Sequence, residues 1–222
     1  MAKEIKKENP QAVAEAVSKT DLFFKENKKA IITVVVAAIV IALGVFCYIK
    51  FVYQPKTAEA AEQTFPAEAL FRNGDFEAAL NGDGNSLGFA DIIDTYGSKA
   101  GKAVYLYAGI CELQLGNFDN AISYLKKYSG KDAILAGRAL ACEGDAYVGL
   151  EQYEKAVSCF VAAAKKSDNI YSATYLLKAG VACEELGKDA EALSYYKEIK
   201  DKYPQSIEGY DIDKYISRIE NK

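Results

Sequence analysis

The side chains of this sequence that could do chemistry are carboxylates and thiols, because its 222 residues include 31 Asp and Glu and five Cys but no His. Histidine is the usual general base near neutral pH and the commonest metal ligand. The adjacent pair Glu184–Glu185 could do acid–base work only if an apolar pocket separated the two pKa values. Neighbouring residues of a helix point to different sides, so we interpret this pair as solvated. No nucleophile elbow, P-loop or dinucleotide fingerprint occurs. The sequence therefore predicts no enzyme, no cofactor and no small-molecule substrate.

One acidic loop, Asn81–Gly88, resembles a calcium-binding loop at some of its positions. Four residues match positions 1, 3, 6 and 12 of an EF-hand loop: Asp83, Asn85, Gly88 and Asp94. Position 5, however, is Leu87, and Asp94 is shorter than the bidentate Glu that usually closes such a loop. A polar turn explains the segment better, and the sequence predicts no metal site.

The thiols do not suggest chemistry either. They are Cys47, Cys111, Cys142, Cys159 and Cys183. None forms a C-x-x-C pair, their number is odd, and Cys47 lies inside an apolar run. A disulfide framework or a zinc site is therefore disfavoured, and we expect small buried hydrophobic residues instead.

That apolar run, Ala30–Ile49, is twenty residues without a charge. As a helix it would span roughly 30 Å, the hydrocarbon thickness of a bilayer. A cleaved signal peptide is the alternative, but the run exceeds the roughly 7–15 residues of a typical signal core. The nearest A-x-A site, Ala58–Ala60, is also too far away. A core helix would show a polar stripe, which is lacking here. We therefore predict a retained transmembrane helix.

Lysine placement predicts the orientation of this helix. Residues 1–29 contain seven Lys, whereas the twenty residues after the run contain only Lys50 and Lys56. The positive-inside rule then places the leading tail in the cytoplasm and the larger part of the chain outside it. Val13, Val17 and Phe24 approach helical spacing, so the tail is either a weak amphipathic helix on the inner membrane surface or a solvated tail.

Internal repetition dominates the rest of the chain. Gly109, Gly144 and Gly180 are 35 and 36 residues apart. Twelve residues after each glycine comes an alanine, and four residues later a bulky residue: Ala121 and Leu125, Ala156 and Phe160, Ala192 and Tyr196. This spacing is typical of the tetratricopeptide repeat (TPR), a helix–turn–helix of about 34 residues. The small residues would let two antiparallel helices approach, and the bulky residue would fill the space beside them.

The predicted fold is all-α, with an N-terminal transmembrane helix followed by a TPR-type α-solenoid of antiparallel helix pairs and a C-terminal capping helix. Gly116 and Gly187 suit the left-handed position after a helix, and Glu151 replaces that glycine in the middle repeat. The expected boundaries are a Lys-rich cytoplasmic tail 1–29, the transmembrane helix 30–49, a linker 50–56, and a helical domain 57–222 made of a degenerate repeat 57–101, repeats 102–136, 137–172 and 173–206, and a capping helix 207–221.

The whole chain resembles bacterial single-pass membrane TPR proteins, in particular those grouped with the ancillary periplasmic subunit of the Sec translocon. The matching features are the Lys-flanked run 30–49 and the segments 89–113 (FADIIDTYGSKAGKAVYLYAGICEL) and 193–206 (LSYYKEIKDKYPQS). The resemblance implies a bacterial inner-membrane protein with a periplasmic C-terminal domain. It also implies that the repeats contact translocon components and periplasmic chaperones.

The expected function follows from the repeats and the charge. Residues 57–222 hold 18 Lys and Arg against 26 Asp and Glu, which disfavours nucleic acid as a partner. We expect a protein-binding scaffold or chaperone-like adaptor that binds translocon or envelope components or unfolded clients. The alternative is a structural component of a machine for outer-membrane or cell-wall biogenesis. The first helices of the repeats should line the concave binding face, with these candidate contact residues: Leu106, Ile110, Gln114, Arg138, Asp145, Thr174, Val181 and Glu184.

Overall fold

The computed structural model describes residues 23–166 and 168–222, and its regular elements there are helices. The chain divides into two units, residues 1–55 and 56–222, each of which is described by itself. The amphipathic helix expected around Val13 and Val17 lies outside the described residues.

The first unit contains α2, Lys28–Tyr48, followed by a π-helical segment, Ile49–Tyr53. None of their residues is buried, and large apolar side chains are exposed all around α2. The hydroxyl of Thr33 donates a hydrogen bond of 2.9 Å to the Lys29 carbonyl, so this polar group is satisfied within the helix. By length and composition, one described helix is apolar enough to cross a membrane, and a signal sequence passes the same test.

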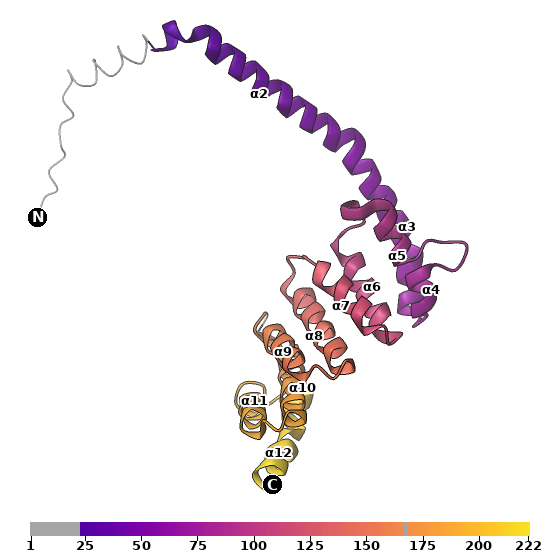
Figure 1. Ribbon diagram of the computed structural model, residues 1–222, viewed down its shortest axis with the longest axis vertical. Coiled ribbons are helices and arrows are strands. Elements are labelled where there is room, and N and C mark those ends of the chain that lie inside the picture. Colours follow the sequence, from indigo (N-terminus) through magenta and orange to yellow (C-terminus); the bar gives the residue numbers. More distant parts are fainter. Residues whose placement is uncertain (1–22, 167) are drawn as a thin grey trace, which may run out of the picture. The chain divides into compact units, whose positions relative to one another are not determined.

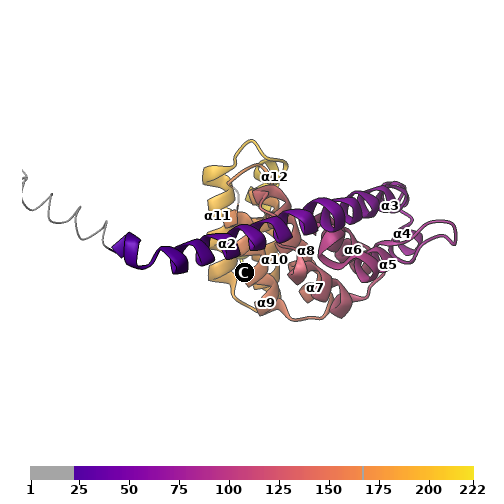
Figure 2. The ribbon, with the colours of Figure 1, turned by 90° about the horizontal axis from the view of Figure 1, so that it is seen from above.

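The second unit is an array of helices in which, from α6 to α12, successive helices along the chain pack against each other (Figures 1 and 2). Its elements are α3 (Gln54–Arg72), α4 (Phe76–Asn81), α5 (Phe89–Tyr96), the short 3₁₀ turn η2 (Gly97–Lys99), α6 (Lys102–Gln114), α7 (Phe118–Lys127), α8 (Ala133–Gly149), α9 (Tyr153–Lys166), α10 (Tyr171–Glu185), α11 (Asp189–Lys202) and α12 (Ile207–Glu220). The helix pairs α6–α7, α8–α9 and α10–α11 are three successive hairpins.

Close helix approach within each hairpin depends on the aligned glycines. A Cβ atom added to Gly180 would come within 2.2 Å of the Tyr196 ring, and one added to Gly144 within 2.6 Å of the Phe160 ring. Gly109 stands in the same relation to Leu125. The alanines of the second helices, Ala121, Ala156 and Ala192, are fully buried. The predicted pairing of a small residue with a bulky one is therefore confirmed in all three hairpins.

The turns inside the hairpins share one backbone conformation. Gly116 and Gly187 have φ values of 80° and 68°, and Glu151 adopts 56° at the corresponding place. A residue with a Cβ is rarely stable in this left-handed region. The middle repeat therefore keeps the turn geometry of its neighbours in spite of its different residue.

The hairpin α6–α7 is preceded by an irregular one, in which α4 and α5 together take the place of a second helix. Between them, the Asp83 carboxylate accepts hydrogen bonds of 2.9 and 2.8 Å from the amides of Asn85 and Ser86. These bonds, the one from Asn85 first, lower the pKa of Asp83. They give the carboxylate the role of a turn cap, as the polar-turn interpretation of this loop expects.

Two hydrophobic clusters form the core of the second unit, and α6 contributes to both. Leu106 and Ile110 of α6 belong to the larger cluster, which continues through α12. Val104, Ala108 and Cys111 of the same helix belong to the smaller cluster with α3, α4 and α5.

Candidate protein-binding groove

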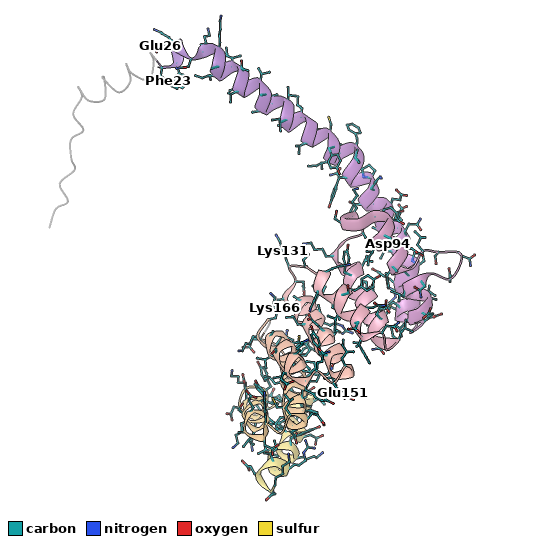
Figure 3. The ribbon with its side chains drawn as sticks, in the orientation of Figure 1. Phe23, Glu26, Asp94, Lys131, Glu151 and Lys166 are labelled. Carbon is teal, nitrogen blue, oxygen red and sulfur yellow. The ribbon has the colours of Figure 1, made fainter. Side chains whose placement is uncertain are left out.

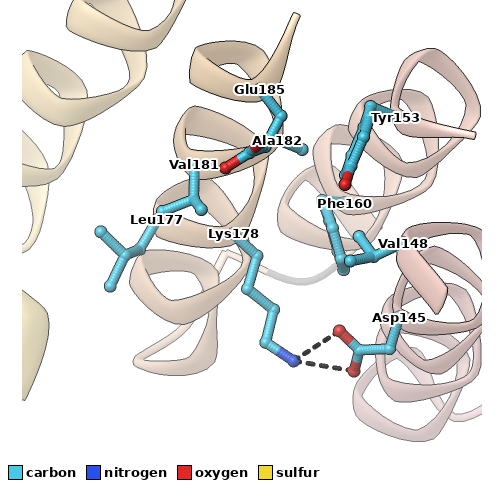
Figure 4. Close-up of a pocket in the computed structure, with 9 residues that line it drawn as sticks. All are labelled: Asp145, Val148, Tyr153, Phe160, Leu177, Lys178, Val181, Ala182 and Glu185. Atoms are coloured by element: carbon cyan, nitrogen blue, oxygen red, sulfur yellow. Dashed lines mark hydrogen bonds and ion pairs between the residues drawn. The ribbon is translucent and has the colours of Figure 1, made fainter. Parts of the chain in front are cut away.

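A cavity of about 310 Å³ opens between α8, α9 and α10 (Figure 4). Three consecutive helices contribute side chains to it: Asp145 and Val148 from α8, Tyr153 and Phe160 from α9, and Leu177, Lys178, Val181, Ala182 and Glu185 from α10. We call this site the groove.

Its middle is apolar and partly open. Val148 and Val181 are 37% and 40% exposed, whereas the Phe160 ring behind them is buried. Branched apolar side chains that remain exposed in a concave site are typical of surfaces that bind another molecule. The groove therefore presents exposed apolar side chains between three consecutive helices.

An ion pair closes one end of the groove. The Lys178 ammonium donates to both carboxylate oxygens of Asp145, at 2.8 and 2.7 Å, as the dashed lines in Figure 4 show. It also lies 5.7 Å from the centre of the Phe160 ring. Both charged side chains are about a third exposed, so the pair contributes at most about 1 kcal/mol to stability. It places one cation and one anion, paired with each other, beside the apolar wall.

The other end carries an uncompensated negative charge. Glu185 is exposed and has no ion-pair partner within the part of the chain that the structure describes. Its neighbour Glu184 accepts a hydrogen bond of 2.7 Å from Tyr196 and is paired with Arg218. Burial alone would raise the pKa of Glu184, but these two partners outweigh it and lower that pKa. The two adjacent carboxylates therefore have different roles, one internal and one facing the groove.

Comparison with known families identifies the array. Two family models, each described as tetratricopeptide repeat, match residues 103–131 and 143–207. The chain contains tetratricopeptide repeats. The second match spans every residue that lines the groove.

Solved structures show the same fold for the TPR array. Two entitled "Crystal structure of MamA" and "Crystal structure of MamA protein" are each 18% identical to this chain, with TM-scores of 0.53 and 0.54. The alignments cover 70% and 75% of this chain and 92% and 87% of those chains. At this identity the likeness concerns the fold alone. No curated protein matches the sequence.

The structure brings together only some of the residues predicted to contact a partner. Asp145 and Val181 line the groove, on facing helices. Arg138 and Gln114 are exposed on α8 and α6 but do not line it.

Four of the residues predicted to contact a partner are instead buried in the TPR array or bonded within it. Leu106 and Ile110 are buried in the larger cluster, so their assignment to an open binding face is wrong. Thr174 donates a hydrogen bond of 2.6 Å to Glu208 of α12, and Glu184 is held by Arg218 of the same helix. The capping helix α12 thus bonds to two of the three α10 side chains that were expected to face a partner, Thr174 and Glu184, and leaves Val181 open.

Several groove residues were missed, some because they lie on a second helix and others because they contact a neighbouring repeat. Tyr153 and Phe160 come from the second helix α9, and Lys178 reaches across from α10 to the preceding repeat. Val148 could have been found, since it lies three residues after Asp145 and therefore shares its helix face.

The thiols of the TPR array are unsuited to nucleophilic chemistry. Cys111, Cys142 and Cys183 are buried, as expected from the sequence. Burial raises the pKa of Cys111 to about 12 and that of Cys142 to about 11. Since the thiolate is the reactive form, these groups pack as small apolar residues near neutral pH. The TPR family typically comprises scaffolds without enzymatic activity, which agrees with this arrangement.

Proposed function

We propose that this chain is a membrane-anchored scaffold whose groove binds an apolar segment of another protein. The observation that carries the proposal is the pair of exposed valines, Val148 and Val181, above a buried ring in a TPR concavity. Such a site gains free energy when a partner's apolar side chain covers it.

The charges around the groove indicate the chemistry of the preferred segment. The Asp145 carboxylate is neutralised by Lys178, but Glu185 at the opposite end is not. A segment with a large apolar side chain next to a Lys or Arg would fill the apolar wall and pair with Glu185. Charge complementarity of this kind favours the correct register and disfavours acidic competitors.

The location of the scaffold follows from the run 30–49, which we propose as a retained anchor in a bacterial inner membrane with the TPR array in the periplasm. The Lys-rich leading tail supports this orientation. A tether raises the effective concentration of the groove near membrane-bound partners. The resemblance to the ancillary periplasmic Sec-translocon subunits makes translocon components the first candidates. Components of an outer-membrane or cell-wall assembly machine are the alternative.

The test of the groove is site-specific photo-crosslinking in native membranes. A photoreactive residue replacing Val148 should capture a partner protein, whereas the same residue replacing Ser158, which is exposed on α9 outside the groove, should capture little. Mass spectrometry of the captured protein separates translocon subunits from envelope-assembly components. Equal capture at the two positions would show that the groove is not the binding surface.

The proposed orientation gives a second expected result. A reporter that is active only in the periplasm should be active when fused after Lys222 and silent when fused before Ala30. The Lys asymmetry around the run is the physical reason, because positively charged flanks are retained in the cytoplasm. A reporter active in both compartments serves as the expression control. The reverse pattern of activity would overturn the orientation.

A further inference from the structure

Exposed apolar side chains recur at the start of successive first helices of the array. They are Ile134 and Leu135 in α8, Ile170 and Tyr171 at α10, and Ile207 and Tyr210 in α12. Ile207, Tyr210 and Ile170 are 86%, 77% and 72% exposed, more than any other large apolar residue described between residues 56 and 222. Ile134, Ile170 and Ile207 are 36 and 37 residues apart, so the feature returns once per repeat.

Hydrogen bonds between neighbouring helices place these starts along one edge of the array. The Ser172 hydroxyl, at the start of α10, donates to the Ala164 carbonyl near the end of α9 at 3.1 Å. The Lys102 ammonium, at the start of α6, donates to the Ser129 carbonyl just after α7 at 2.8 Å. Figure 3 shows Lys131 and Lys166 on one side of the array and Glu151, in a hairpin turn, on the other. First helices therefore begin where second helices end.

The same edge is where the chain enters the second unit. The Tyr96 hydroxyl, at the end of α5, donates to a Glu59 carboxylate oxygen near the start of α3 at 3.0 Å. The end of α5 leads directly to the start of α6, so the beginning of the unit lies beside the first helix starts. Only ten residues separate Glu59 from Ile49, the last residue of the apolar run. We call this side, formed by residues 56–60, 129–135, 165–166, 168–172 and 202–210, the tether edge.

Lysines accompany the apolar residues along the tether edge. Lys131 precedes α8, Lys165 and Lys166 lie in the last turn of α9, and Lys202, which pairs with Glu198 at 2.7 Å, lies in the last turn of α11. Lysines near a helix C-terminus are favoured by the helix dipole, which accounts for their presence without any partner. The dipole does not account for the exposed isoleucines and tyrosines that alternate with them.

The carboxylates of the same edge are engaged within the array. Asp132 accepts a hydrogen bond of 2.8 Å from the Leu135 amide, and Glu208 accepts one from Thr174. Asp168 accepts a hydrogen bond from Tyr203. Their donors are uncharged, so these carboxylates stay anionic, and the edge carries charges of both signs. The exposed apolar side chains beside Lys131, Lys165 and Lys166 are the combination typical of surfaces that lie in a membrane interface.

We propose that the tether edge rests on the surface of the lipid bilayer. Its exposed isoleucine, leucine and tyrosine side chains then lie at the boundary between headgroups and acyl chains, and its lysines lie at the lipid phosphates. This inference builds on the proposed membrane anchor. A bilayer suits the feature better than a second copy of the chain, because the apolar residues form a broken row at the period of the repeats rather than one contiguous face. The groove, which opens between helices rather than at their ends, stays accessible to a protein partner.

The sequence contains no tryptophan, so a single tryptophan introduced by mutation reports by its fluorescence on its own position. The full-length chain is reconstituted into vesicles of brominated phospholipid with single tryptophans: Ile170→Trp at the tether edge, Lys188→Trp in the hairpin turn on the opposite side, and Phe46→Trp in the apolar run. We expect an about twofold or greater loss of Ile170→Trp emission relative to unbrominated lipid, because interfacial apolar groups lie about 5–10 Å deep. Lys188→Trp emission should stay unchanged.

The three variants separate the failure of this inference from the failure of the proposed anchor. If Phe46→Trp emission is quenched but Ile170→Trp emission is no more affected than that of Lys188→Trp, the edge does not touch the bilayer. A blue-shifted Ile170→Trp emission without quenching would show burial against protein, such as a second copy, and would also overturn the inference. If Phe46→Trp itself is not quenched, the anchor is absent and the proposed function fails. An Ile207→Trp variant repeats the measurement one repeat further along the edge.

Discussion

Replacing Tyr196 with alanine should lower the free energy of unfolding of the helical array by about 3–5 kcal/mol, the range observed when a large buried aromatic is truncated. Tyr196 is fully buried, and its ring fills the space beside Gly180. It also packs against the Tyr215 ring of the capping helix, with 5.3 Å between ring centres. The truncation would leave a cavity at the junction of three helices, α10, α11 and α12.

The measurement is chemical denaturation of residues 56–222, followed by circular dichroism. Tyr196→Phe is the matched control, because it keeps the ring and removes only the hydrogen bond to Glu184. Glu184 retains Arg218, so we expect the control to cost only about 0.5–1.5 kcal/mol, the usual net value of one hydrogen bond. Equal losses for the two variants would mean that the ring does not fill the space described.

Replacing Val181 with aspartate should reduce the yield of partner crosslinked from position 148 by at least about tenfold, which corresponds to 1.4 kcal/mol of binding free energy. Val181 stands in the apolar wall of the groove, and Glu185 and Asp145 also line the site. A bound apolar side chain would cover the new carboxylate, and the nearest cation of the groove, Lys178, is already paired with Asp145, so this burial is costly. Repulsion from Glu185 would add to this cost.

Val181→Leu is the control for this experiment, since it keeps the wall apolar and should preserve at least part of the yield. Val181 is partly exposed, so neither variant should unfold the array, and circular dichroism checks this. An undiminished yield from a folded Val181→Asp protein would exclude the groove as the binding site. The exposed residue Arg138 on α8 would then be the next position to test by charge reversal.

The sequence predicted the hairpins well because each depends on a local rule. A glycine and a bulky residue sixteen positions later recur in three repeats, and Gly180 meets Tyr196 as that spacing requires. The irregularity of the first hairpin could also be predicted, because the loop after Asn81 interrupts an otherwise helical pattern. These features involve residues close in sequence, whose geometry the helix and turn fix.

The groove was only partly predictable because it depends on contacts between repeats. Asp145 was identified from its register, but its partner Lys178 lies on another hairpin. Thr174 and Glu184 were expected to contact a partner, but they bond to α12 instead. The spacing of residues within a single repeat does not reveal how α12 packs against α10. The orientation of the apolar run and the identity of the partner remain predictions.

The position of α6 between the two hydrophobic clusters has a consequence for how the array loses structure. Leu106 joins one cluster and Val104 the other, so each side of the array is completed by a different face of a single helix. In repeat arrays, stability is close to a sum of local and nearest-neighbour contributions. We therefore expect damage near α12 to destabilise the helices before α6 only weakly, so that α3, α4 and α5 can keep their structure when the groove region unfolds. Two segments should thus lose structure in separate steps, coupled through α6 and through side chains that join the clusters, such as Phe71, which packs against both.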